Sequence, residues 1–342
     1  MKRALVLGAG PAGLSAALSL SAKGVPVLLL DRQGWGGRPE QLACKGIVEC
    51  VRCDVCLAHD LVAKAMRDPL IQRMKGATLM ALSGDAGGFT ASIRRPDGQR
   101  TRRRVGSVIV CIGSDVFDAD QEPRLGHGNV EGVLTAQELE RALHDTGQTG
   151  KNGQLRSMAF IQCVGSRDAQ HGAEYCSRAC CKYSMKLGQL ARKMLPAVKI
   201  SYYIMDWRPC GPADDLYSWA RTDGNVEVVR SRPAEVFEGE EGRPALRYAS
   251  PGDGAIEERA FDLVVLSQGV RPTHDSADLC GRLALRKDDH GFIWSPPGEP
   301  CLTSREGVFS AGSCRRPMDI VEAAMDGATA ASGAFESMGG NA

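Results

Sequence analysis

The sequence feature that most constrains the fold is a glycine-rich turn between an apolar strand and a helix at the N-terminus. The segment RALVL predicts a strand, Gly8-x-Gly10-x-x-Gly13 follows it, an Ala/Leu/Ser-rich helix runs to about Lys23, and a second strand, VPVLLL, ends at Asp31. In such a unit the glycines permit a tight turn and close approach of a pyrophosphate, and the acid after the second strand accepts a ribose hydroxyl. The pattern predicts a βαβ unit that binds a dinucleotide.

Two later segments favour FAD as that dinucleotide. VIVCIGS (108–114) resembles the strand and glycine that close the FAD pocket of flavoproteins with two dinucleotide-binding domains, and GVFSAGS (307–313) resembles their C-terminal strand. Those proteins have Asp where this chain has Ser313, which alters one contact. The sequence predicts an α/β fold with Rossmann-type βαβ domains. The resemblance implies two such domains, as in thioredoxin reductase. The residues expected to bind FAD are Gly8, Gly10, Pro11, Ala12, Gly13, Asp31, Arg32, Gly37, Arg38, Ile112, Gly113, Gly312, Ser313, Asp319 and Ile320.

A polar stretch, HDTGQTGKNGQLR (144–156), predicts the crossover into a second domain. That domain reads as a strand (SMAFIQ), a long helix (CSRACCKYSMKLGQLARKML) and another strand (VKISYYIM). We therefore expect an FAD-binding domain of residues 1–150 plus 285–342, and an inserted domain of residues 151–284 that resembles the NAD domain of such flavoproteins. Within the first domain, HDLVAKAMRDPLIQRM (59–74) predicts a helix.

Composition narrows the partners and the compartment. The 342 residues carry a formal net charge of +1, which gives no reason to expect nucleic acid or an anionic membrane as a partner. No apolar run approaches the roughly 20 residues needed to span a bilayer. Thirteen cysteines in a chain of this size indicate metal ligation or redox chemistry in a cytoplasmic protein rather than a disulfide framework.

The most informative cysteines are Cys163, Cys176, Cys180 and Cys181. Cys163 ends the strand SMAFIQ, and the other three fall in the helix expected over 176–195, with Cys176 and Cys180 one turn apart on one face. The end of the strand and the start of the helix meet in a βα unit, and the helix dipole there favours thiolates. Four thiolates fit a [4Fe–4S] cluster, although a zinc site or a disulfide between the two adjacent cysteines remains open.

The same segments carry a family resemblance. IQCVGSRD followed by YCSRACCKYSMK resembles the A-type subunits of the heterodisulfide reductases, as do CDVCLA (53–58), VIVCIGSDVFDA (108–119) and AGSCRRPMDI (311–320). The resemblance implies bound FAD, a [4Fe–4S] cluster close to the flavin, and a Lys186 that points toward the reactive edge of the isoalloxazine. It also implies a homodimer with iron–sulfur B- and C-type subunits as partners.

The chain lacks the ferredoxin modules that extend many of these A-type subunits, since it has no CxxCxxCxxxC run. This short form most resembles the A-type subunit of the heterodisulfide-reductase-like complex of sulfur oxidisers. We therefore expect a relay of electrons through flavin and cluster rather than electron bifurcation.

A second group, Cys44, Cys50, Cys53 and Cys56, follows the first βαβ unit. Three interpretations stay open: a redox disulfide between Cys53 and Cys56 beside the flavin, a second metal site, or packing. The first would make the chain an FAD-dependent pyridine-nucleotide disulfide oxidoreductase. No second GxGxxG follows SMAFIQ, so we do not expect direct oxidation of NAD(P)H.

Overall fold

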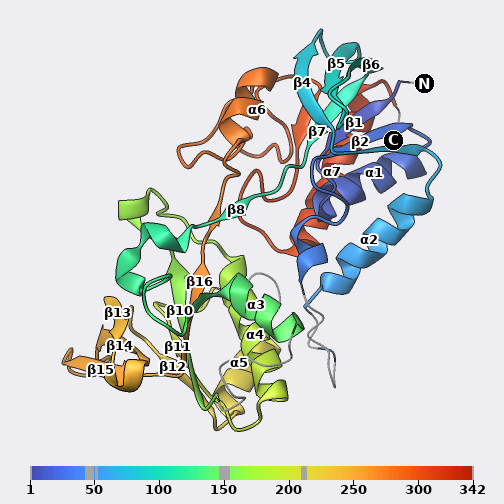
Figure 1. Ribbon diagram of the computed structural model, residues 1–342. Helices are drawn as coiled ribbons and strands as arrows, with labels where there is room; N and C mark the ends of the chain where they lie inside the picture. Colours follow the sequence, from blue (N-terminus) through green and yellow to red (C-terminus); the bar gives the residue numbers. More distant parts are fainter. Residues whose placement is uncertain (1, 43–49, 51–52, 146–154, 209–213, 341–342) are drawn as a thin grey trace. The chain divides into compact units, whose positions relative to one another are not determined.

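The computed structural model describes residues 2–42, 50, 53–145, 155–208 and 214–340 (Figure 1). The chain divides into two compact units: unit 1 comprises Met1–Gln41, Asp54–Asp115 and Arg271–Ala342, and unit 2 comprises Leu42–Cys53 and Val116–Val270. Apart from the boundaries of Leu42–Cys53, the chain crosses between them in two short paired strands, β8 (Asp115–Val116) and β17 (Val270–Arg271). The sequence prediction put the crossings near residues 150 and 285. The difference arises because a strand after residue 132 joins the sheet of unit 2, and a helix after residue 275 packs in unit 1.

Unit 1 is built on a five-stranded parallel sheet with the order β18-β7-β1-β2-β3. Val6 packs on one face of this sheet and Leu5 and Leu7 on the other, so both faces are buried, as parallel sheets require. The expected βαβ unit is present, with α1 joining the parallel strands β1 and β2. The bounds are β1 (Ala4–Leu7), α1 (Pro11–Ala22), β2 (Val27–Asp31), β3 (Ile71–Lys75), β7 (Ser107–Val110) and β18 (Val308–Ser310).

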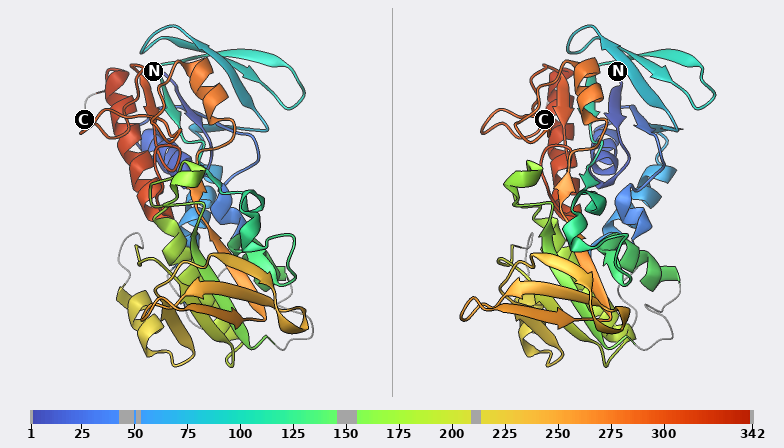
Figure 2. Two further views of the ribbon diagram at one scale, coloured as in Figure 1. Left: turned by 90° about the vertical axis from the view of Figure 1, so that its left-hand side faces the viewer. Right: turned by 60° about the vertical axis from the view of Figure 1, so that its left-hand side comes forward.

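Two different layers cover the sheet of unit 1 (Figure 2). Helices α1, α2 and α7 pack on one face, where Gly327 of α7 lies so close to α1 that a Cβ would be 2.0 Å from the Ala12 carbonyl oxygen. The antiparallel sheet β4-β5-β6 and helix α6 pack on the other face. The bounds are η1 (Arg38–Gln41), α2 (Val55–Arg67), β4 (Thr78–Ser83), β5 (Phe89–Arg94), β6 (Arg100–Val105), α6 (Ser276–Leu283) and α7 (Ile320–Ser337).

Unit 2 repeats this design with a second five-stranded parallel sheet, ordered β12-β11-β10-β16-β9. Its central strand alternates in the same way, with Phe160 packed on one face and Ile161 on the other. The bounds are β9 (Val133–Thr135), β10 (Ser157–Val164), β11 (Lys199–Tyr203), β12 (Val226–Val229) and β16 (Leu263–Gln268).

Helices α3, α4 and α5 cover one face of the unit 2 sheet, and the antiparallel sheet β13-β14-β15 covers the other. The fold is thus α/β with parallel sheets, as the sequence predicted. The bounds are η2 (Ala119–Gln121), η3 (Pro123–Leu125), α3 (Ala136–Asp145), η5 (Ala169–His171), α4 (Ala179–Met194), α5 (Asp214–Thr222), β13 (Glu235–Glu238), η6 (Glu240–Gly242), β14 (Pro244–Ala249) and β15 (Ile256–Ala260).

Two predicted helices have different limits in the structure. The helix expected over 176–195 begins at Ala179, because the backbone of Arg178 is left-handed, with φ of +56°. Cys176 therefore lies outside the helix, and the prediction that it shares a helical face with Cys180 was wrong. The helix expected over 59–74 ends at Arg67, because Pro69 follows, and the chain continues as strand β3.

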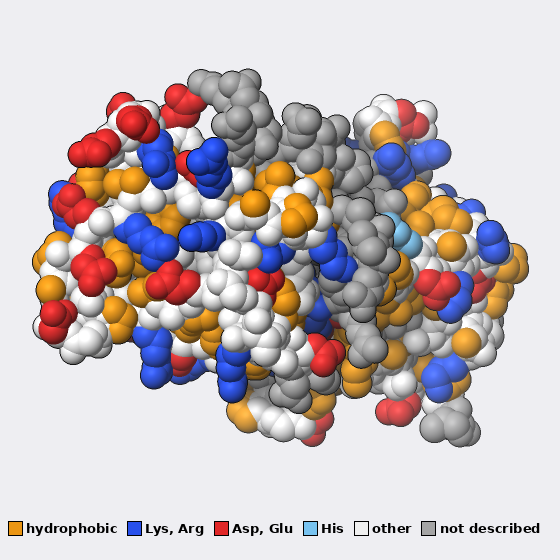
Figure 3. All heavy atoms as spheres, turned by 90° about the horizontal axis from the view of Figure 1, so that it is seen from below, with side chains coloured by type: hydrophobic (Ala, Val, Ile, Leu, Met, Phe, Trp, Pro, Cys, Tyr) orange, Lys and Arg blue, Asp and Glu red, His pale blue; other side chains and the backbone are white. Residues whose placement is uncertain are grey.

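The charged side chains form no single-sign field on the face shown in Figure 3, where Lys and Arg are interspersed with Asp and Glu. This distribution agrees with the formal net charge of +1. Within the described part of the chain, no helix combines the length and the apolar character needed to cross a membrane.

Candidate cofactor sites

The glycine turn after β1 is packed so tightly that two of its three glycines have no room for a side chain. A Cβ on Gly8, whose φ is +97°, would lie 2.2 Å from the carbonyl oxygen of Cys111, and one on Gly13 would lie 1.8 Å from that of Gly8. A Cβ on Gly10 would meet no protein atom within 4 Å. The turn itself therefore requires Gly8 and Gly13, whereas the open space at Gly10 is available to a ligand at the N-terminus of α1.

Asp31, at the end of β2, fixes the shape of this turn. Its carboxylate accepts hydrogen bonds from the backbone N–H groups of Ala9 (2.7 Å), Gln33 (2.8 Å) and Gly34 (2.8 Å). Carboxylate oxygens accept more than one hydrogen bond each, so the side chain retains capacity for a ribose hydroxyl. The carboxylate thus ties the two strand ends that would flank the ribose.

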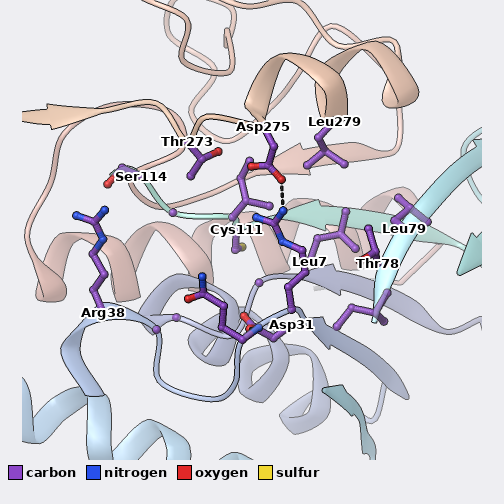
Figure 4. A pocket seen from close by; sticks show the side chains of 18 of the residues that line it. Leu7, Asp31, Arg38, Thr78, Leu79, Cys111, Ser114, Thr273, Asp275 and Leu279 are labelled. Carbon is purple, nitrogen blue, oxygen red and sulfur yellow. Dashed lines mark hydrogen bonds and ion pairs between the residues drawn. The ribbon is translucent and has the colours of Figure 1, made fainter. Parts of the chain in front are cut away.

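A cavity of about 680 Å³ opens where β1, β2 and β7 end (Figure 4). The strand order of unit 1 reverses direction between β1 and β7, and open α/β sheets bind ligands at this switch point. The volume lies within the range of pockets for cofactor-sized ligands. Of the predicted FAD-binding residues, those that line the cavity are Gly8, Gly10, Pro11, Asp31, Arg32, Gly37, Arg38, Ile112, Gly113 and Ser313.

The remaining predicted FAD-binding residues, Ala12, Gly13, Gly312, Asp319 and Ile320, are not among the lining residues. Three of them have structural tasks instead. Ala12 and Gly312 pack so closely that a Cβ on Gly312 would lie 2.7 Å from that of Ala12. Asp319 caps α7 by accepting the Glu322 N–H at 2.8 Å. These residues support the site through packing and capping.

The turn that presents Ser313 to the cavity is held by a buried ion pair. The carboxylate of Asp326, on α7, accepts the Gly312 N–H at 2.8 Å and two bonds from the Arg315 guanidinium at 2.7 and 2.8 Å. Both side chains are about nine-tenths buried. A buried ion pair with charge-assisted hydrogen bonds of this kind fixes the backbone on either side of Ser313.

Part of the cavity wall was not predicted from the sequence. Thr78 and Leu79 of β4 and Leu279 of α6 line it, and Asp275 just before α6 forms an ion pair with Arg32 across it (Figure 4). These segments carry no local motif. Asp275 lies 243 residues after Arg32, so their pairing depends on long-range packing that no local sequence pattern reports.

The four cysteines predicted to hold a cluster lie together at the carboxyl edge of the unit 2 sheet. Cys163 lies within a register shift near the end of β10, Cys180 and Cys181 start α4, and Cys176 lies in the intervening loop. All four are free thiols, and only Cys176 has appreciable exposure. Like the glycine turn of unit 1, the group sits where the strand order reverses, here between β10 and β16.

The thiols influence one another's ionisation. Burial, followed by the charge of Cys181, raises the pKa of Cys163 to about 11. A hydrogen bond from Cys180 lowers the pKa of Cys181, and the Arg178 N–H donates to the Cys176 sulfur at 3.3 Å. Buried thiols whose thiolates would repel one another lose their protons readily only when a metal or another cation stabilises the thiolates.

The spacing of these sulfurs separates two kinds of metal site. A tetrahedral zinc site, with Zn–S bonds of about 2.3 Å, needs four sulfurs within about 4 Å of one another. Within the described residues, the group of three potential ligand atoms found within 4.8 Å is Glu122, Asp168 and His171, and no three of the cysteine sulfurs are that close. Arg124 and Arg232 already pair the two carboxylates, which leaves that group poorly suited to a cation.

The loop between Cys163 and Cys176 packs on the end of β16. A Cβ on Gly269 would lie 2.6 Å from that of Ser166 and 2.9 Å from the Ser177 hydroxyl. The Tyr175 hydroxyl donates to the Val270 carbonyl at 2.8 Å, and the Val270 N–H donates to the Ser177 hydroxyl at 2.7 Å. The strand end that a nucleotide would approach in such a domain is therefore covered by the chain's own loop.

The remaining predicted site residues are less tightly grouped. Lys186 lies in α4 with only 8% of its surface exposed, which is unusual for a lysine. Cys53 is half-buried just before α2, Cys56 is exposed in its first turn, and both are free thiols. Cys50 is also exposed, and Cys44 lies outside the described residues.

Comparisons with known proteins agree with this geometry. Residues 1–41 match the model of the FAD binding domain. The chain is 29% identical to the iron–sulfur A-type subunit 2 of the CoB–CoM heterodisulfide reductase of Methanopyrus kandleri, over 96% of this chain and 63% of that protein. It is 38% identical to the A-type subunit of the ferredoxin:CoB–CoM heterodisulfide reductase of Methanosarcina mazei, over 68% of this chain and 31% of that protein. The chain thus spans less than two thirds of the length of these relatives.

Solved structures show the same fold. The thioredoxin reductase of T. acidophilum superposes with a TM-score of 0.64 at 17% identity, covering 98% of both chains. That of Lactococcus lactis superposes with a TM-score of 0.63 at 18% identity, covering 99% of both. The predicted thioredoxin-reductase-like architecture with two dinucleotide-binding domains is thereby confirmed.

Proposed function

Because the chain belongs to the family of heterodisulfide reductase A-type subunits, we propose that it is the flavin-carrying electron-transfer subunit of a heterodisulfide-reductase-like complex. As an FAD-dependent oxidoreductase of this family, it would hold FAD in unit 1 and a [4Fe–4S] cluster in unit 2. The observation that carries the proposal is the cysteine group at the switch point of the unit 2 sheet, in a domain whose partner unit has a glycine turn in the comparable place.

The unit 1 cavity supports FAD as the first cofactor. Gly10 leaves open space at the N-terminus of α1, where the helix dipole and free N–H groups attract phosphate, and Asp31 stands ready for a ribose hydroxyl. Ser313 replaces the family's Asp, so a neutral hydroxyl faces the cofactor at that point. The Asp326–Arg315 pair keeps that turn in position.

The cysteine spacing supports an iron–sulfur cluster over zinc. No three of the four sulfurs lie within 4.8 Å of one another, whereas a tetrahedral zinc ion holds its thiolates within about 4 Å and a cubane of four irons and four sulfides separates them more widely. Cys163, Cys176, Cys180 and Cys181 would each supply one thiolate. When bound, FAD and the cluster together supply the conversion between paired and single electrons.

The finer parts of the proposal rest on the family resemblance. We assign the chain to the short form found in the complexes of sulfur oxidisers, acting as a homodimer in the cytoplasm with iron–sulfur B- and C-type subunits. Lys186 would face the reactive edge of the isoalloxazine, where a buried ammonium group would stabilise negative charge on the reduced ring.

The alternative, a pyridine-nucleotide disulfide oxidoreductase that uses Cys53 and Cys56, is less well supported. In unit 2, the loop of Ser166, Tyr175 and Ser177 covers the strand end that a nicotinamide nucleotide would approach. Cys56 is exposed on α2, and both cysteines are free. Neither observation favours a disulfide built for hydride-driven reduction.

The test is the iron, acid-labile sulfide and FAD content of anaerobically purified protein, together with its visible spectrum. About four irons and four sulfides per FAD are expected, the count that a cubane requires. A yellow protein without iron from an iron-replete preparation would overturn the cluster assignment. Rapid reduction of its flavin by NAD(P)H alone would then favour the alternative.

A further inference from the structure

The end of β10 and the loop that follows it adopt an uncommon backbone conformation at two functional side chains. Cys163 has a φ of +61° and Arg167 a φ of +54°, both in the left-handed region that side-chain-bearing residues avoid. Each costs about 1–2 kcal/mol, and such residues persist where the surroundings require them. Two such residues so close together in the chain indicate that the direction of both side chains matters.

A turn brings Arg167 close to Cys163, because the Ser166 N–H donates to the Cys163 carbonyl at 3.1 Å. The charge of the Arg167 guanidinium and a hydrogen bond from it oppose the effect of burial on the pKa of the Cys163 thiol. The Arg167 side chain is only 19% exposed, so water screens its charge weakly. Its backbone is anchored as well, because its N–H donates to the Tyr175 carbonyl at 3.0 Å.

Asp206, after β11, fixes the other side of the guanidinium. Its carboxylate forms an ion pair with Arg167 and a second one with Arg208, at 2.9 Å. The Arg208 side chain is 54% exposed, and it reaches the cysteines only through its backbone hydrogen bond to Cys181. Two arginines thus share one carboxylate, but only Arg167 brings its charge to a cysteine sulfur.

We propose that Arg167, positioned by Asp206, raises the reduction potential of the cluster held by the four cysteines by stabilising its reduced state. Adding one electron makes such a cluster one charge more negative, so a nearby cation favours the reduced form, and hydrogen bonds to the ligand sulfurs act in the same direction. The inference rests on the proposed function, since it requires that the cluster be present. Arg167 acts through Cys163 and is a positioning residue rather than a catalytic one.

The experiment is a potentiometric titration of the cluster, followed by electron paramagnetic resonance, in Arg167→Gln, Arg167→Lys and Arg208→Gln. Arg167→Gln should lower the midpoint potential, while Arg167→Lys, which keeps the charge, should stay closer to the wild type. Arg208→Gln is the matched control, because it removes an arginine from the same carboxylate without removing a charge from a sulfur. Iron per FAD is measured in each protein and should remain at the wild-type value.

Each outcome decides a separate question. A wild-type protein without a cluster would refute the proposed function itself. A cluster in Arg167→Gln with the wild-type potential, or an equal shift in Arg208→Gln, would overturn the role of Arg167 while leaving the proposed function intact. Loss of the cluster from Arg167→Gln but not from Arg167→Lys would show that the charge is needed for cluster assembly rather than for the potential. That result would also overturn the inference.

Discussion

Gly8 and Cys163 hold comparable places in two units of the same design. Gly8 follows β1 and Cys163 lies near the end of β10, which are the strands beside which the order of each five-stranded parallel sheet reverses. Both residues have a left-handed backbone, with φ of +97° and +61°. Glycine adopts this conformation freely, whereas for cysteine it costs about 1–2 kcal/mol. The turn that begins at Gly8 leaves open space for a phosphate at Gly10, whereas Cys163 contributes one of the four grouped cysteine sulfurs.

The two units also stabilise these positions by different means. In unit 1 the turn is held by backbone contacts so close that no side chain fits, as at Gly13. In unit 2 the loop is held by side chains: the Phe117 ring covers Gly165, and His171 contacts both Phe117 and Glu122. Because side chains rather than backbone contacts hold the loop of unit 2, substitutions can alter that loop without disturbing the glycine turn of unit 1.

The largest effect should come from Cys163→Ala, which tests whether the two sites are independent. The variant should lose essentially all of its iron and sulfide and retain FAD, because three thiolates do not complete a cubane and the FAD cavity is lined by unit 1 residues. Iron, sulfide and FAD per chain are measured after anaerobic purification. Cys280→Ala, which removes a buried thiol of unit 1, is the control and should keep the iron. Loss of FAD together with the iron from Cys163→Ala would refute the independence of the two sites.

The glycine turn provides a matched pair with the next largest effect. Gly13→Ala should destabilise the apoprotein by about 3 kcal/mol, because its Cβ would lie 1.8 Å from the Gly8 carbonyl oxygen. Gly10→Ala should leave the apoprotein as stable as the wild type, since its Cβ meets no protein atom and the φ of Gly10 is −76°.

Urea denaturation of the apoprotein and titration with FAD separate these two roles. Gly10→Ala should bind FAD more weakly, because the added methyl group occupies the space assigned to the pyrophosphate. Unchanged FAD affinity in Gly10→Ala would contradict that assignment, even if Gly13→Ala behaved as expected.

Gly165→Ala should produce a smaller loss of stability, and it tests the loop between Cys163 and Cys176 in unit 2. Its Cβ would lie 2.0 Å from the Phe117 ring, and its φ is +67°. We expect a loss of about 2–3 kcal/mol, of which the backbone term is about 1–2. In a Phe117→Ala background the same substitution should cost only the backbone term, which a double-mutant cycle of urea denaturation measures. Equal costs in both backgrounds would show that the ring does not hold the loop.

The strength of the local signals explains how much of this could be predicted from the sequence. The βαβ unit with Gly8, Gly10 and Gly13 was predictable because the strand, the turn and the helix are contiguous and each has its own periodicity. The grouping of Cys163 with Cys180 and Cys181 was predictable for the same reason, since the end of a strand and the start of the next helix meet in any βα unit.

Features that depend on distant packing were not predictable. The late start of α4 depends on the left-handed Arg178, so the sequence placed Cys176 on a helix that does not reach it. The pairing of Arg32 with Asp275 and the cover of Phe117 over Gly165 join segments that share no local pattern. No sequence motif marks Arg167, whose role depends on its left-handed backbone, its ion pair with Asp206 and its effect on the pKa of Cys163.

The smallest effect we expect is a loss of stability at low pH that arises from Glu122, which contacts the loop between Cys163 and Cys176 through His171. A hydrogen bond from Arg124, at 2.9 Å, lowers the pKa of Glu122 in the folded state, more than burial raises it. A lowered folded-state pKa contributes stability above the unfolded value of about 4.3, and this contribution is lost as the pH falls through the folded value. Because the Arg124 side chain is 60% exposed, the contribution should stay below about 1 kcal/mol.

Urea denaturation at pH 6 and pH 3 measures this dependence. The wild type should lose more stability between these values than Glu122→Gln, which has no charge to titrate at that position. Glu174→Gln makes the same change of charge at an exposed position of the same loop and should behave like the wild type. Identical acid sensitivity in all three proteins would mean that the contact of Glu122 with His171, at 3.0 Å, does not help to hold the loop. The loop between Cys163 and Cys176 would then be held mainly by the packing of Phe117 against Gly165. Like the glycine turn of unit 1, it would depend on steric contacts rather than on ion pairs.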